Sequence, residues 1–246
     1  MSEQKIIEKG SLEHKLVELC RDGSLEDVRA LLDAGADPNA VMPDEFDSGE
    51  WGGGYSAVHS AAENPDIRII KLLVERGADV NVGDFYESTP LYYAASKNTL
   101  AMVEYLVSLG NDPLDENYDG DNLLTVSACN PHKDVLEYFL QKGVEIDGVS
   151  DINPLGMAMR YGTPADMDFF IEHGANREVA LAYAHHDAPL DNIRHLLETG
   201  CDINAVFNPF SAKRHDWTKL PEGPLRRLFL EFGAKSDEEL GGSNRG

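Results

Sequence analysis

The chain has 246 residues, of which 42% are hydrophobic, and its 44 Asp and Glu against 21 Lys and Arg give a formal charge of -23. A surface this acidic repels nucleic acid and anionic lipid, whose affinities depend on basic side chains, and no stretch approaches the ~20 apolar residues that a membrane span needs. Three widely spaced cysteines, Cys20, Cys129 and Cys201, argue against a disulfide framework or a zinc site and favour a reducing compartment.

The first segment, residues 1–11, is polar and charged and lacks the apolar stretch of a secretory signal. We therefore expect an N-terminal tail and a cytoplasmic location. Beyond it, a glycine recurs after steps of 42, 33, 33, 31, 26 and 33 residues. The recurring glycines are Gly35, Gly77, Gly110, Gly143, Gly174, Gly200 and Gly233.

Apolar residues precede each of these glycines at minus three and minus four, and also at minus seven except at Arg226. That spacing places one apolar stripe on a short helix. The glycine then stands where the helix stops, in the left-handed conformation that a side chain would penalise. Twenty-one residues before four of the glycines stand Ser56, Thr89, Asn122 and Asn153, which predict the N-caps of an earlier helix. Each unit is thus predicted to be a turn followed by two helices.

These markers resemble the ankyrin repeat. The best matches are Thr89-Pro90-Leu91, His59 and the Gly-Ala-Asp-Val-Asn run 77–81, and the resemblance covers residues 12–235. It implies an all-α solenoid of about seven stacked helix pairs, with hairpin-like turns, atypical end caps and a flexible tail over 236–246. It also implies that His59 hydrogen-bonds the turns of neighbouring repeats.

Three segments depart from the regular repeat. The first step carries nine extra residues within 41–55, whereas the step from Gly174 to Gly200 is seven residues short, so the finger-like turn there is expected to be missing. Residues 205–220 do not have the pattern of an ordinary first helix, and the sequence does not place them.

The segment 115–121 begins like a calcium loop, with Asp115, Asn117, Asp119 and Gly120 at the right offsets. Its twelfth position holds Val126, where an EF-hand needs a bidentate glutamate. Because the closing ligand is missing and an ankyrin turn falls at this place, we favour an ordinary acidic turn over a metal site.

The remaining candidates for chemistry have plainer explanations. His185, His186 and His195 are expected to have structural or solvent-facing roles, and Cys201 stands where other units have alanine. Nucleotide-binding and hydrolase motifs are missing. The sequence therefore predicts no catalytic residue, no metal and no cofactor.

The turns carry the sharper signal. Segments 41–54, 79–90, 111–122 and 144–153 together hold fifteen Asp or Glu and no Lys or Arg, and they also carry aromatic residues. The aromatic side chains could cover the helix ends beneath them, but an acidic ridge with aromatic anchors also suits a basic protein surface. On the second interpretation the contact residues are Asp44, Glu45, Phe46, Asp47, Glu50, Trp51, Tyr55, Phe85, Tyr86, Asp115, Glu116, Tyr118 and Asp119.

The predicted function is a non-catalytic protein-protein interaction module, monomeric when unbound, that binds a protein with a basic surface. Its extreme acidity slightly favours an inhibitor of the immunity type, which occludes a toxin or nuclease. The alternative is an adaptor or scaffold, and a metal-dependent enzyme is a remote third. Within the long finger, Trp51 is predicted to contact the partner, and the competing interpretation folds it over the array as a lid.

Overall fold

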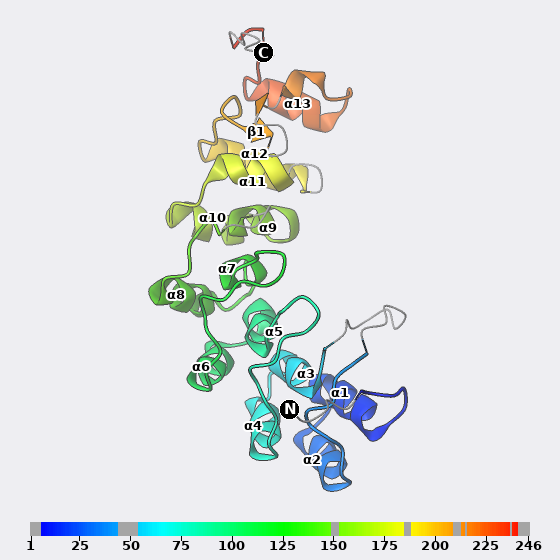
Figure 1. Cartoon of the computed structure of the whole chain (residues 1–246). Helices are drawn as coiled ribbons and strands as arrows, with labels where there is room; N and C mark the ends of the chain where they lie inside the picture. Colours follow the sequence, from blue (N-terminus) through cyan, green and yellow to red (C-terminus); the bar gives the residue numbers. More distant parts are fainter. Residues whose placement is uncertain are drawn as a thin grey trace. The chain divides into compact units, whose positions relative to one another are not determined.

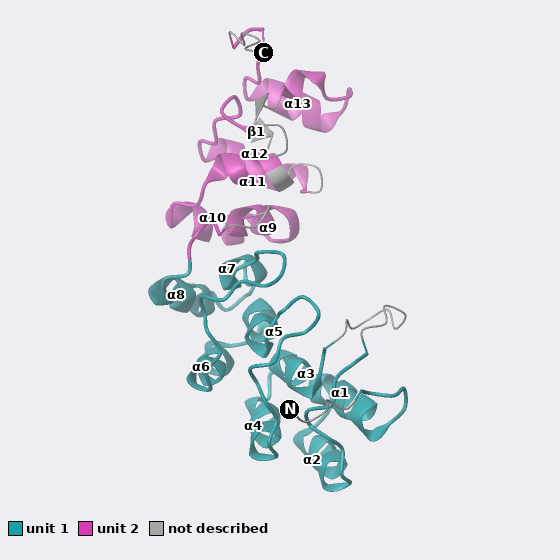
Figure 2. Cartoon of the chain, viewed as in Figure 1, with its two compact units in different colours: residues 1–144 teal, residues 145–246 magenta. Residues whose placement is uncertain are grey.

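The computed structural model divides the chain into two compact units, residues 1–144 and 145–246, which are described separately (Figures 1 and 2). It describes residues 6–43, 54–148, 153–184, 188–208, 213–214, 216–236 and 238–240.

The first unit is built from successive pairs of short helices, as the repeat pattern predicts. First helices pack against one another along the unit, α1 on α3, α3 on α5 and α5 on α7 (Figure 1). Second helices pack beside them, α2 on α4 and α6 on α8. The pairs are α1 (Leu12–Asp22) with α2 (Leu25–Asp33), α3 (Ala57–Glu63) with α4 (Ile67–Glu75), α5 (Pro90–Lys97) with α6 (Leu100–Ser108), and α7 (Leu123–Val126) with α8 (Lys133–Lys142).

The second unit continues the pattern and ends in an atypical cap. Its pairs are α9 (Pro154–Tyr161) with α10 (Pro164–Glu172) and α11 (Arg177–Ala184) with α12 (Leu190–Glu198). In the last repeat, α13 (Pro224–Glu231) packs on the 3-10 helix η2 (Trp217–Lys219) where a regular first helix would stand. Among the described residues the strands are the two-residue β1 (Phe207–Asn208) and β2 (Lys213–Arg214), which pair antiparallel. The all-α prediction is confirmed.

The glycine stops are confirmed at every predicted position. Their φ angles lie between 81° and 106°, in the left-handed region. A Cβ placed on Gly77 would meet nothing within 4 Å, so the backbone angle rather than a shortage of space favours glycine there. The four predicted N-cap residues all occupy the N-cap position. Asn122 Oδ1 accepts the Thr125 N–H at 3.0 Å and Asn153 Oδ1 accepts the Gly156 N–H at 2.9 Å, whereas Thr89 makes no side-chain cap bond.

Buried asparagines join successive helix pairs. The Asn98 side-chain amide donates to the carbonyls of Ala62 and Asn64, both at 2.9 Å, and Asn130 repeats the arrangement on Ala95 and Asn98. Each amide satisfies carbonyls that the end of the preceding first helix leaves without a helical partner. The contacts therefore fix the spacing between repeats within the first unit.

The ends of the array differ from simple tails. Ile7 is 4% exposed and its N–H donates to Val41 O at 2.8 Å, so the segment predicted as a tail over 1–11 packs on the array in its described part. At the other end, within the predicted tail over 236–246, Ser236 and Glu239 cap a short turn, with the Ser236 N–H 2.7 Å from Glu239 Oε2.

The structure explains the two irregular segments of the second unit, residues 174–200 and the described part of 205–220. Helix α11 begins three residues after Gly174, which leaves no room for a finger, as expected. In the segment that the sequence did not place, Trp217 is 1% exposed and its indole N–H donates to Ile203 O at 2.8 Å. Its ring lies 4.6 Å from that of Phe229, so η2 fills the space of the missing first helix and caps the core.

Candidate functional site

Apart from Tyr55, the predicted contact residues divide into three groups. Residues Asp44, Glu45, Phe46, Asp47, Glu50 and Trp51 lie outside the described residues. We call residues 41–55, 79–90 and 111–122 the first, second and third fingers. Three aromatic residues of the second and third fingers are exposed, Phe85 by 51%, Tyr86 by 41% and Tyr118 by 74%. The three predicted carboxylates of the third finger, Asp115, Glu116 and Asp119, are exposed beside Tyr118.

The prediction for Tyr55 as a contact residue is wrong for the folded chain. Tyr55 is only 2% exposed, its ring stacks on His59 with 5.2 Å between centroids, and its hydroxyl accepts a hydrogen bond from Ser60. Its carbonyl accepts the Met42 N–H at 2.8 Å, which closes the base of the long finger as a hairpin. Tyr55 therefore anchors the finger to the core.

The second finger is organised around one carboxylate. Asp84 Oδ1 accepts the backbone N–H groups of Tyr86 and Ser88, each at 2.9 Å, and its Oδ2 accepts the Tyr93 hydroxyl. These bonds tie the tip of the finger to helix α5. The rings of Phe85 and Tyr86 meet edge to face, 5.4 Å apart.

The third finger repeats this turn with an amide in place of the carboxylate. Asn117 Oδ1 accepts the N–H groups of Asp119 at 3.1 Å and Asp121 at 2.9 Å. The oxygen that a calcium loop would present to the ion therefore serves the turn, which supports the ordinary-turn interpretation. Within the described part of the chain, no three His, Cys, Asp or Glu side chains are grouped as a metal ion would require.

The two fingers form one surface because the Tyr118 N–H donates to Tyr86 O at 2.8 Å. This bond places the aromatic residues of one finger beside those of the next. We call the surface made of Phe85, Tyr86, Asp115, Glu116, Tyr118 and Asp119 the finger ridge.

Glu87 adopts a strained backbone conformation next to the ridge. It is the one non-glycine with positive φ among the described residues, at 61°, and it occupies the place that Gly120 has in the following finger, where φ is 77°. The correspondence is set by matching bonds, Glu87 N–H to Asp84 O and Gly120 N–H to Asn117 O, both 2.9 Å. A left-handed conformation costs a residue with a Cβ roughly 1–2 kcal/mol.

We expect Glu87→Gly to raise the free energy of unfolding by about 1 kcal/mol and Gly120→Ala to lower it by about the same amount. Urea denaturation followed by circular dichroism measures both changes. Glu87→Ala, which retains a Cβ, serves as the control and should give little gain. A gain from Glu87→Ala equal to that from Glu87→Gly would mean that side-chain repulsion, not backbone strain, destabilises the turn.

Residues of helices α5 and α7, with Ser88 just before α5, line an open pocket of about 230 Å³: Ser88, Tyr92, Tyr93, Ser96 and Val126. The Tyr92 hydroxyl donates to Asp115 O at 2.6 Å, which ties the pocket wall to the third finger. Sequence reasoning missed this pocket. The sequence feature that could have indicated the pocket is the pair Tyr92-Tyr93, which directly follows Thr89-Pro90-Leu91 at the start of α5. The other first helices have a smaller residue at one or both of these two positions.

His59 serves the turns, as the resemblance implied. Its Nδ1 accepts the Ser56 N–H at 3.1 Å, and its Nε2–H donates to Val82 O in the next finger at 3.2 Å. Burial lowers the pKa of His59 from 6.5 to about 4, against the weaker opposing influence of Asp84. The ring is therefore neutral when the chain is folded at neutral pH.

The low pKa of His59 predicts a loss of stability in mild acid. In the unfolded chain the imidazole takes up a proton at its ordinary pKa of 6.5, but in the folded chain it does so only near 4. The contribution of His59 to the free energy of unfolding is thus fully present above pH 6.5. It is lost as the pH falls from 6.5 to about 4, by on the order of 3 kcal/mol in total. Urea denaturation across this range should show a flatter profile for His59→Gln than for the wild type. The exposed His132→Gln is the control, and a wild-type slope in His59→Gln would contradict the assignment.

His195 contacts a carboxylate on a neighbouring helix, and Cys20 and Cys201 are buried. His195 Nε2 lies 2.7 Å from Asp168 Oδ1 on the neighbouring helix α10, a surface ion pair when the ring is protonated. Burial raises the pKa of the Cys20 and Cys201 thiols, which disfavours the reactive thiolate. His185 and His186 lie outside the described residues.

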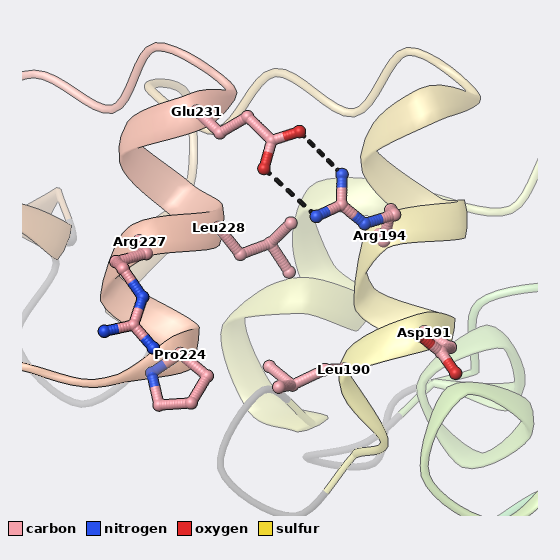
Figure 3. Close-up of a pocket in the computed structure, with 7 residues that line it drawn as sticks. All are labelled: Leu190, Asp191, Arg194, Pro224, Arg227, Leu228 and Glu231. Carbon is pink, nitrogen blue, oxygen red and sulfur yellow. Dashed lines mark hydrogen bonds and ion pairs between the residues drawn. The ribbon is translucent and has the colours of Figure 1, made fainter.

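A second hollow, of about 400 Å³, lies between α12 and α13 (Figure 3). Arg194 and Glu231 face each other across it and form two hydrogen bonds, at 2.7 and 3.0 Å. Leu190, Leu228 and Pro224 supply its apolar lining. Asp191 and Arg227 also line the hollow, so its charged residues are of both signs, whereas those of the finger ridge are all acidic.

Comparison with known proteins identifies the repeat. A family model described as ankyrin repeats in three copies matches residues 16–117 and again 58–150, more than half of the chain. The chain belongs to the ankyrin-repeat family. Ankyrin repeats are protein-protein interaction modules. Within the part of the chain that the structure describes, no helix has the length and apolarity needed to cross a membrane.

Several curated ankyrin-repeat relatives resemble the chain over part of their length. Ankyrin repeat protein nuc-2 of Neurospora crassa is 26% identical over 87% of this chain, and a putative palmitoyltransferase, ZDHHC13 of Danio rerio, is 27% identical over 77%. Protein phosphatase 1 regulatory subunit 27 of Mus musculus is 38% identical over 38% of the chain. The matches span 20%, 30% and 59% of these three relatives.

Proposed function

We propose that the chain is a non-catalytic binding module whose finger ridge contacts a partner protein with a basic surface. The observation that supports this most is the combination of Phe85, Tyr86 and Tyr118, exposed on adjoining fingers, with a complete lack of Lys and Arg in those fingers. Exposed aromatic side chains bury large areas with few rotors to fix, and the carboxylates steer a cationic partner and disfavour an acidic one.

Within this function we favour an inhibitor of the immunity type, which binds a basic toxin or nuclease and occludes it. The acidity of the fingers supports this, because nucleic-acid-binding surfaces are basic. An adaptor that links partners is the alternative. An inhibitor and an adaptor both control another protein by binding to it. The relative named as a regulatory subunit of protein phosphatase 1 supports this common feature. We further propose that the unbound protein is monomeric and acts in the cytoplasm.

The charge of the ridge provides the test. After a partner has been captured from native lysate and identified, its association with wild type and with Asp115→Asn/Glu116→Gln/Asp119→Asn is followed by surface plasmon resonance. We expect the triple variant to associate several-fold more slowly at low salt, with the difference shrinking as the screening length falls to about 8 Å near physiological ionic strength.

A matched triple variant controls for net charge. Glu75→Gln, Glu104→Gln and Asp134→Asn remove three exposed carboxylates from α4, α6 and α8. The change in net charge is the same, so only the position differs. Equal slowing by both triples would assign the effect to overall charge, and no slowing by either would mean that the acidity serves solubility.

A further inference from the structure

The pocket between α5 and α7 adjoins the finger ridge through shared residues. Ser88 ends the turn that Asp84 organises, and Tyr92 is bonded to the backbone of the third finger at Asp115. Tyr93, Ser96 and Val126 are half-buried and open onto solvent, whereas Tyr92 is 4% exposed. A partner seated on the ridge would therefore have the mouth of this pocket within its footprint.

The surroundings of the pocket are strongly negative. Tyr93 lies beside Asp84, whose carboxylate accepts its hydroxyl, and is also influenced by Glu63. Tyr92 feels the charges of Asp115, Glu116 and Asp121. These carboxylates add to burial in raising the pKa of both phenols. Of these carboxylates, Glu63 is paired with the Lys97 ammonium at 2.6 Å.

Resting on the proposed function and deepening it, we propose that this pocket receives one arginine side chain of the basic partner. The faces of tyrosine rings attract cations through their quadrupole, and the surrounding carboxylates add long-range attraction. The Ser96 hydroxyl donates to Tyr93 O at 2.8 Å, so its oxygen lone pairs remain to accept a hydrogen bond from a guanidinium.

Size and chemistry select arginine over other side chains. At about 230 Å³ the pocket is smaller than the ~300–1,000 Å³ of sites for drug-sized ligands, and suits a single long side chain. A leucine or phenylalanine would gain nothing from the carboxylates. A lysine ammonium is more strongly hydrated than a guanidinium and lacks the planar fork that stacks on tyrosine and bonds several acceptors.

Small probes test the pocket without knowledge of the partner. Butylguanidinium is titrated into the full-length chain against butylammonium and the neutral butylurea, while the Val126 methyl signals are followed by NMR. We expect a saturable shift with butylguanidinium, an affinity about tenfold above that for butylurea, and weaker binding of butylammonium. Equal affinity for butylurea would overturn the cationic assignment, and equal affinity for butylammonium would overturn the choice of arginine.

Variants locate the binding. Ser96→Leu fills the pocket and should abolish the Val126 shift, whereas Ser108→Leu, an exposed serine on α6, should leave it intact. Tyr93→Phe retains the ring and should weaken binding only several-fold, which keeps the test valid if Ser96→Leu proves unstable. An unchanged shift in both pocket variants would refute the site.

The two proposals fail separately. If butylguanidinium saturates the pocket but the ridge triple variant associates with the partner at the wild-type rate, the proposed role of the finger ridge is refuted. The guanidinium site in the pocket is then retained. If the ridge variant slows association but no probe shifts Val126, the arginine pocket alone is refuted.

Discussion

Leu106→Asp is expected to unfold the first unit. Leu106 is fully buried in α6, which packs on α5 and α8, so aspartate would place an uncompensated polar group in the core and remove an apolar one. We expect a loss above about 4 kcal/mol, a large fraction of the ~5–15 kcal/mol that stabilises a typical domain. Far-ultraviolet circular dichroism during urea denaturation measures it.

A leucine of the next turn gives the matched control. Leu114 is 56% exposed, so Leu114→Asp should change the free energy of unfolding by less than about 0.5 kcal/mol. Each helix pair buries its apolar stripe only against its neighbours, so the damage from Leu106→Asp should extend to adjoining repeats. A cooperative transition at the wild-type urea concentration would show that Leu106 contributes little to the packing between pairs.

The features predicted correctly from sequence are local ones. Gly77 ends its helix because of its own φ angle, and Asn122 caps α7 by bonding the backbone three residues ahead. Both depend on the identity of a residue and its neighbours in the chain. Repetition then multiplied the signal, so that helix pairs were predicted even where individual motifs were weak.

The features that sequence reasoning missed depend on contacts between distant segments. Tyr55 was predicted to face a partner, but it is buried because the hairpin at the base of its finger packs against His59 and Ser60. Ile7 was assigned to a tail, yet it pairs with Val41. No regular spacing in the sequence indicates either contact. The polar composition of the surrounding segments therefore led to the prediction that both residues lie at the surface.

The asparagine contacts and the pocket were missed for a related reason. Asn98 bonds carbonyls 34 and 36 residues earlier, and Val126 lines the same pocket as Tyr93 because α7 packs on α5. Single residues at the same place in successive repeats look unremarkable one by one. These residues interact only because successive helix pairs stack on one another. Aligning the repeats on their glycine stops would show that the residues occupy equivalent positions and could therefore predict the contacts.

For binding, the largest single effect is expected from Tyr118→Ala. Tyr118 is 74% exposed in the finger ridge, and its N–H to Tyr86 O bond does not involve the side chain. Truncation should therefore remove contact area without loosening the fingers. If the proposed function holds, affinity for the captured partner falls by about 2 kcal/mol or more, roughly thirtyfold. The midpoint of urea denaturation should stay within error of the wild type.

Tyr161→Ala distinguishes a contact at the ridge from a general effect of losing an exposed tyrosine. Tyr161 is 65% exposed at the end of α9, away from the fingers in sequence, and its ring faces the Arg160 guanidinium. Its truncation should leave affinity unchanged. If Tyr118→Ala instead lowers the free energy of unfolding, the ring packs on the turn beneath it. A packed side chain contributes to folding, whereas a contact side chain contributes only when the partner is bound. If Tyr118→Ala changes neither affinity nor stability, the finger ridge is a solvated surface and the partner binds elsewhere.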